Sequence, residues 1–88
     1  MEIDWEEVNL IIQEWSSKWS FMKKPNDMPL EDFEKIRFLI DEIYSFPDNQ
    51  KSLLESAALF EKHLNGTYSR LSPKSINWLV DRFCFSNR

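Results

Sequence analysis

Apolar side chains recur every three or four positions along most of this 88-residue chain. The first run of this kind comprises Trp5, Val8, Ile12, Trp15, Trp19 and Met22. That spacing places the apolar side chains on one face of an α-helix and differs from the alternation that a half-buried strand requires. The chain has only one glycine, and no Asn-Gly turn separates two alternating runs. The sequence therefore predicts helices and no strand.

Two helices are expected in the first half of the chain. The first spans residues 4–21, because Asp4 followed by Glu7 resembles a capping box. The second spans residues 29–45, with Pro29 near its first position. Its buried stripe should comprise Leu30, Phe33, Ile36 or Arg37, Ile40 and Ile43. Between the two helices, a lysine pair and a proline interrupt the helical spacing.

Two further helices are expected in the second half. Asp48 or Asn49 can cap the third helix, and Gly66 can end it at Asn65 by adopting a left-handed conformation. The fourth spans residues 73–84 and begins with a Ser-Pro pair. The third should bury Leu53, Leu54, Ala57, Phe60 and Leu64, and the fourth Ile76, Leu79 or Val80, and Phe83. Short connections favour a single all-α domain over residues 1–88, folded as a compact antiparallel four-helix arrangement.

Charge is distributed unevenly along the chain. Residues 1–61 carry 14 acidic and 6 basic side chains, a formal charge of −8, whereas residues 62–88 carry 1 acidic and 5 basic side chains, a formal charge of +4. An acidic surface attracts basic proteins and repels nucleic acids at long range. The composition therefore favours a basic protein partner and argues against direct nucleic-acid binding.

The sequence offers little for catalysis, and we expect no enzyme. His63 is the only histidine and Cys84 the only cysteine, so a zinc site lacks its usual four ligands and no internal disulfide can form. No catalytic, cofactor-binding or metal-binding residue is therefore predicted. The acidic start is unlike a signal peptide, and no apolar run approaches the roughly 18 residues of a membrane span. A cytoplasmic location without membrane association is expected.

We expect the partner to bind the outward faces of the first two helices. Aromatic residues at the edge of such a face can act as anchors, because tyrosine and tryptophan are enriched among the residues that dominate binding. The predicted partner-binding residues are Glu6, Glu7, Glu14, Glu31, Asp32, Glu34, Asp41, Glu42, Trp19 and Tyr44. A matched arrangement of carboxylates for acid–base catalysis is not expected, because neighbouring acids on a helix point in different directions.

Several segments resemble small bacterial immunity proteins of contact-dependent inhibition and bacteriocin systems. They are a Glu14-Trp15 pair, the segment Leu39-Ile40-Asp41-Glu42-Ile43, a break at Pro47, and the closing stretch from Tyr68 to Trp78-Leu79-Val80-Asp81-Arg82-Phe83. The resemblance implies a cytosolic helical inhibitor that binds and blocks a cognate toxin, often a basic nuclease. Such a protein needs no catalysis, since an acidic surface can occlude a cationic active site.

Three alternatives fit the same sequence. A phage-encoded inhibitor of a host nucleic-acid enzyme would use the same acidic charge. A helical oligomerisation module, such as a homodimer, would pair chains through the seam of Trp5, Val8, Ile12, Trp15 and Trp19. A nucleic-acid-binding regulator would use the basic C-terminal helix, with Arg70, Lys74, Arg82 and Arg88 interleaved with Tyr68 and Trp78.

Overall fold

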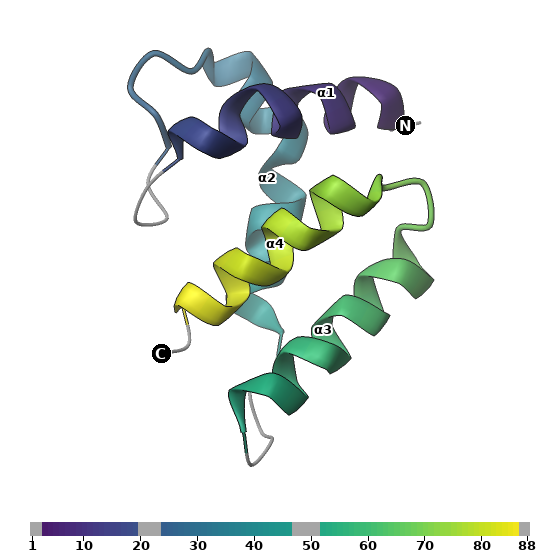
Figure 1. Cartoon of the computed structure of the whole chain (residues 1–88). Coiled ribbons are helices and arrows are strands. Elements are labelled where there is room, and N and C mark those ends of the chain that lie inside the picture. The colour runs from purple at the N-terminus through teal and green to yellow at the C-terminus, as the bar shows by residue number, and fades with distance from the viewer. Residues whose placement is uncertain (1–2, 20–23, 47–51, 87–88) are drawn as a thin grey trace.

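The computed structural model describes residues 3–19, 24–46 and 52–86. Within these ranges it contains four α-helices and no strand (Figure 1). The helices are α1 (Trp5–Trp15), α2 (Leu30–Ser45), α3 (Leu53–Thr67) and α4 (Pro73–Ser86), and a 3-10 turn, η1 (Ser16–Lys18), follows α1. The predicted all-α, four-helix class is confirmed. None of the helices in these ranges combines the length and apolar composition needed to cross a bilayer.

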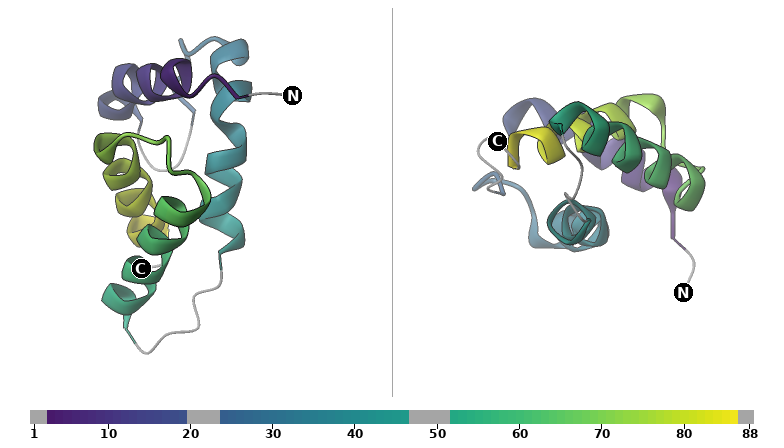
Figure 2. Two further views of the ribbon diagram at one scale, coloured as in Figure 1. Left: turned by 90° about the vertical axis from the view of Figure 1, so that its right-hand side faces the viewer. Right: turned by 90° about the horizontal axis from the view of Figure 1, so that it is seen from below.

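The helices pack in two directions. Helices α3 and α4 lie side by side and run in opposite directions, with α2 alongside them (Figure 1). Helix α1 lies crosswise near the start of α2, as the turned view shows (Figure 2). The antiparallel arrangement predicted for all four helices is thus visible in the α3–α4 pair, while α1 crosses its neighbours. This crossing brings the first turns of α1 and α2 together.

All four helices contribute side chains to one buried core. The rings of Phe60 on α3 and Phe83 on α4 stack with centroids 4.5 Å apart, and Phe46 packs against both. The predicted stripes are confirmed at Ile36, Ile40, Ile43, Ala57, Phe60, Leu64, Ile76, Leu79 and Phe83, all of which are buried. Leu39, which the predicted stripe omitted, is fully buried.

Two leucines predicted to be buried are exposed. Leu54 is 83 % exposed and Leu30 is 65 % exposed. Successive residues on a helix point about 100° apart, so Leu53 and Leu54 cannot share one narrow stripe. Leu53 is half-buried and Leu54 faces outward. Leu30 is the first residue of α2, ahead of the part of the helix that contacts the core.

The first helix is shorter than predicted. Its α-helical part ends at Trp15, and η1 leads to Trp19, which has an extended backbone with φ −89° and ψ 120°. Trp19 stacks on Phe33 and makes an edge contact with Trp78, and its carbonyl group accepts a hydrogen bond from the Arg82 guanidinium. These tertiary contacts outweigh the local helical spacing. The rest of the predicted span, residues 20–21, lies outside the described residues.

Helix caps were predicted well at two of three starts. The Asp4 carboxylate accepts a hydrogen bond from the Glu7 N–H group at 3.1 Å, and the Ser72 hydroxyl oxygen accepts one from the Ser75 N–H group at 3.2 Å. Helix α3 is capped by Ser52 instead of Asp48 or Asn49, both of which lie outside the described residues.

The predicted end of α3 was wrong. The helix continues through Gly66 to Thr67, and Tyr68 forms the C-cap with its N–H group bonded to the Leu64 carbonyl. Gly66 does not adopt the left-handed conformation that a glycine stop requires. The Tyr68 ring is held by Trp5 and by α2, which fixes the point where the chain leaves the helix.

Candidate functional site

A groove of about 520 Å³ lies between α1 and α2. It is lined by Ile3, Asp4, Glu7 and Val8 from the α1 side and by Glu31, Glu34, Lys35 and Phe38 from α2. Ile3, Val8 and Phe38 are the apolar lining residues. The other described lining residues carry four carboxylates and one ammonium group. We call this feature the acidic groove. Among the residues that the structure describes, the groove has four negative groups and one positive group, a formal charge of −3.

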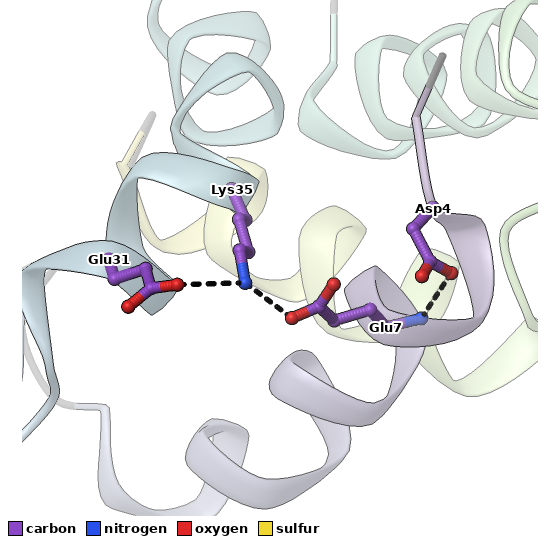
Figure 3. Close-up of polar contacts among 4 residues, drawn as sticks. All are labelled: Asp4, Glu7, Glu31 and Lys35. Atoms are coloured by element: carbon purple, nitrogen blue, oxygen red, sulfur yellow. Dashed lines mark hydrogen bonds and ion pairs between the residues drawn. The ribbon is translucent and has the colours of Figure 1, made fainter.

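The local sequence places these side chains at the start of α1 and between Glu31 and Phe38 on α2, which α1 crosses. Asp4 caps α1, so Glu7 lies in the first turn with its side chain directed toward α2 (Figure 3). On α2, Glu31 and Lys35 are four positions apart and share one face. The crossing of α1 over α2 then brings Glu7 next to Lys35, although 28 positions separate them.

Lys35 occupies the centre of this charge arrangement. Its ammonium group donates a hydrogen bond to Glu7 and lies 3.5 Å from the nearer oxygen of Glu31 (Figure 3). The hydrogen bond to Glu7 raises the pKa of Lys35 above its ordinary value, and the charges of Glu7 and Glu31 act in the same direction against desolvation. Lys35 therefore stays protonated. Glu34 pairs with Arg37 at 3.5 Å on the exposed side of α2.

Three of the predicted partner-binding acids come together in the acidic groove: Glu7, Glu31 and Glu34. The remaining acids are dispersed. Glu6 and Glu14 are exposed on α1, Asp41 is exposed on α2, and Asp32 is half-buried on α2. Tyr44, one of the two predicted anchors, is 60 % exposed near the end of α2.

The other predicted anchor, Trp19, is not available to a partner in this fold. Its side chain is 3 % exposed, because the extended backbone turns it into the core. The seam considered for pairing two chains is also occupied within one chain, where Val8, Ile12 and Trp15 are buried. Trp5 is half-buried and forms an aromatic cluster with Phe38 and Tyr68, with ring centroids 5.6 to 6.0 Å apart.

Glu42 was predicted to contact a partner, but both of its carboxylate oxygens are engaged within the fold. One oxygen accepts a hydrogen bond from the Tyr68 hydroxyl at 2.9 Å, and the other lies 2.7 Å from Nε2 of His63. Burial, followed by the hydrogen bond and charge of Glu42, raises the pKa of Tyr68 to about 12. This cluster joins α2 to the end of α3, because His63 and Tyr68 lie 21 and 26 positions after Glu42 in the sequence.

The same cluster has the order of groups found in a nucleophile–base–acid triad. Nδ1 of His63 lies 3.4 Å from the Thr67 hydroxyl, and Nε2 faces Glu42. However, Thr67 is the last residue of α3, where the free backbone groups are carbonyls. Stabilising an oxyanion requires hydrogen-bond donors, and backbone carbonyl groups are acceptors. What the contacts show is a hydrogen-bonded link between α2 and the end of α3. Within residues 3–19, 24–46 and 52–86, no group of three or more His, Cys, Asp or Glu side chains is placed to hold a metal ion.

The basic C-terminal helix presents fewer accessible cations than its sequence suggested. The Arg82 guanidinium bonds to the Trp19 carbonyl and lies 5.8 Å from the Trp78 ring. It therefore holds the segment after α1 against α4. Arg70 and Lys74 are exposed, and Arg88 lies outside the described residues.

The acidic groove includes residues that sequence reasoning missed. Lys35 could have been linked to Glu31 by their spacing, but its contact with Glu7 depends on the helix crossing. Val8 was predicted only as part of the apolar face of the first helix. Comparison of the chain with protein family models, with characterised proteins and with solved structures finds no significant match.

Proposed function

We propose that this chain is a small acidic binding protein that holds a basic protein partner at the acidic groove and inhibits it by occlusion. One observation carries the proposal: among the described residues, four carboxylates and one ammonium group line a partly apolar groove. The excess negative charge favours a cationic ligand. The apolar lining supplies contact area that a purely charged surface lacks.

The two parts of the groove have different roles in binding. Complementary charges raise the rate of encounter with a basic protein, in a manner that salt weakens. Contacts that become buried in the complex determine mainly how long it lasts. In this proposal, Glu31 and Glu34 attract the partner, and Ile3 and Phe38 retain it.

The most specific form of the proposal is an immunity protein that acts in the cytoplasm on a cognate toxin, such as a nuclease. The resemblance of several segments to bacterial immunity proteins supports this form, and the acidic groove supports it independently. A nuclease binds its substrate through cationic side chains. An acidic protein that covers those side chains excludes the nucleic acid without any chemistry of its own.

The test is differential capture from a lysate of the native cells, with the chain immobilised through its C-terminus. A Glu31→Lys/Glu34→Lys variant reverses two charges in the groove. A Glu61→Lys/Asp81→Lys variant makes the same net change at exposed positions on α3 and α4. We expect a basic protein to be retained by the wild type and the α3–α4 variant but lost from the groove variant. Equal retention by all three would refute the proposal.

A further inference from the structure

We propose that the acidic groove accepts one arginine side chain of its partner, and that Lys35 is an internal competitor which this arginine displaces. The inference rests on the proposed function, because it specifies what enters the same groove. Three observations support it: the volume of the groove, its apolar lining and the position of the Lys35 ammonium group.

The groove matches a long side chain that is apolar along its length and charged at its tip. Its volume of about 520 Å³ falls in the range of about 300–1,000 Å³ that is typical of small-ligand pockets. Ile3, which is 42 % exposed, and the half-buried Phe38 can contact the methylene groups of such a side chain, while carboxylates hold its charged end. A groove of this size suits one inserted side chain better than a whole helix.

Lys35 shows that these carboxylates can hold a cation. Its ammonium group bonds to Glu7 and lies 3.5 Å from Glu31, while its side chain remains 35 % exposed. Ion pairs at such exposure contribute little to stability, so exchanging one cation for another requires little free energy. The protein's own lysine therefore blocks the groove only weakly.

Arginine fits the groove better than lysine. A guanidinium group is planar, can bond two carboxylate oxygens at once, and stacks on aromatic rings. Phe38 lines the groove, and edge contacts with Trp5 and Tyr68 fix the orientation of its ring. Glu31 and Glu34 line the same side, so a guanidinium has both an aromatic ring and carboxylates within one groove.

The test uses an acetylated, amidated glycine–serine peptide with one central arginine, titrated into the isotopically labelled full chain and followed by NMR. The same peptide with lysine, or with neutral citrulline, provides the comparison. We expect the arginine peptide to shift the amide signals of Val8 and Phe38, the lysine peptide to bind more weakly, and the citrulline peptide to leave them unchanged.

The decisive variant is Lys35→Met, which removes the competing charge but keeps a long side chain. We expect the arginine peptide to bind about fivefold more tightly to this variant, because it no longer has to break an ion pair of Lys35, and one such pair at about 4 Å in water corresponds to that factor. Lys35→Gln should also increase the affinity for the arginine peptide. It provides a second test if Lys35→Met alters the fold. Glu34→Gln should weaken binding, and Glu61→Gln should leave it unchanged.

The outcomes separate the two proposals. If removing the Lys35 charge weakens arginine binding or leaves it unchanged, or if citrulline binds equally, the inference is overturned. The proposed function would still stand if Glu31→Lys/Glu34→Lys abolished capture of the basic protein. If that charge reversal has no effect on capture, the proposed function fails regardless of what the peptide does.

Discussion

The side-chain oxygen of Asn9 on α1 accepts a hydrogen bond from the Ser72 backbone N–H group at 2.9 Å, across 63 positions of sequence. The same oxygen accepts a bond from the buried Ser75 hydroxyl, and the Asn9 amide group donates to the Arg70 carbonyl. One amide therefore connects α1 to the start of α4.

Replacing this amide should destabilise the fold. Asn9→Ala removes the acceptor for Ser72 and Ser75, and a buried donor left unpaired costs about 1–3 kcal/mol. We expect the free energy of unfolding in urea to fall by that amount. Asn77→Ala, at an exposed position within α4, is the matched control and should stay within about 0.5 kcal/mol of the wild type. Equal effects of the two changes would contradict the role given to Asn9.

Gly66→Ala should stabilise the protein. Gly66 lies inside α3 without a left-handed backbone, and a Cβ atom added there would meet no atom within 4 Å. Alanine costs less conformational entropy than glycine in a helix, by about 0.5–1 kcal/mol. The midpoint of urea unfolding should therefore rise. A clear loss of stability would show that Gly66 ends the helix in a left-handed conformation after all.

Tyr68 should titrate at unusually high pH. Its pKa is raised from 10.0 to about 12 in the folded protein. Because the folded state holds this proton more tightly than the unfolded chain does, its stabilising effect is complete below pH 10 and is lost as the pH rises to about 12.

The ultraviolet absorbance of tyrosinate, measured against pH, reports this ionisation directly. Tyr68→Phe should remove a titration step near pH 12 and should reduce the alkaline loss of stability relative to the wild type. If the step near pH 12 persisted in Tyr68→Phe, or if the step lost from this variant lay near pH 10, the environment described for this hydroxyl would be ruled out.

Trp15 and Leu54 should differ sharply in their contribution to stability. Trp15 is 7 % exposed and Leu54 is 83 % exposed, although both belong to predicted apolar stripes. Trp15→Ala should lower the free energy of unfolding by roughly 3–5 kcal/mol, whereas Leu54→Ala should change it by less than about 0.5 kcal/mol. Chemical denaturation followed by circular dichroism measures both.

Trp15→Phe separates two contributions of the indole ring. The indole N–H group of Trp15 is buried and meets no hydrogen-bond acceptor in the described part of the chain. Phenylalanine keeps an aromatic ring and removes this donor, so its cost should be much smaller than that of alanine. A cost equal to that of Trp15→Ala would indicate that the indole ring is needed for its full shape.

Much of the fold is predictable because helical periodicity and capping are local properties. The spacing of Ile36, Ile40 and Ile43 identified the buried face of α2, and Asp4 marked the start of α1. Periodicity does not show how far a helix continues once tertiary contacts compete with it. Trp19 continues the spacing of the first helix, yet packing against Trp78 places it on extended backbone.

The candidate site was predictable only in part, for a related reason. An acid-rich face on each of the first two helices follows from the sequence, but the meeting of Glu7 with Lys35 depends on the angle at which α1 crosses α2. The engagement of Glu42 by His63 and Tyr68 depends likewise on contacts between distant segments. Sequence spacing identifies the helix face on which a residue lies. It does not identify the helix or segment that packs against that face.

The central claim is that a basic protein binds at the acidic groove, and its most direct test is the association rate constant of the captured partner as a function of salt. We expect Glu31→Lys/Glu34→Lys to slow association by roughly tenfold at low salt, with the difference shrinking as salt is added and helicity unchanged. Association as fast as that of Glu61→Lys/Asp81→Lys at every salt concentration would contradict the account.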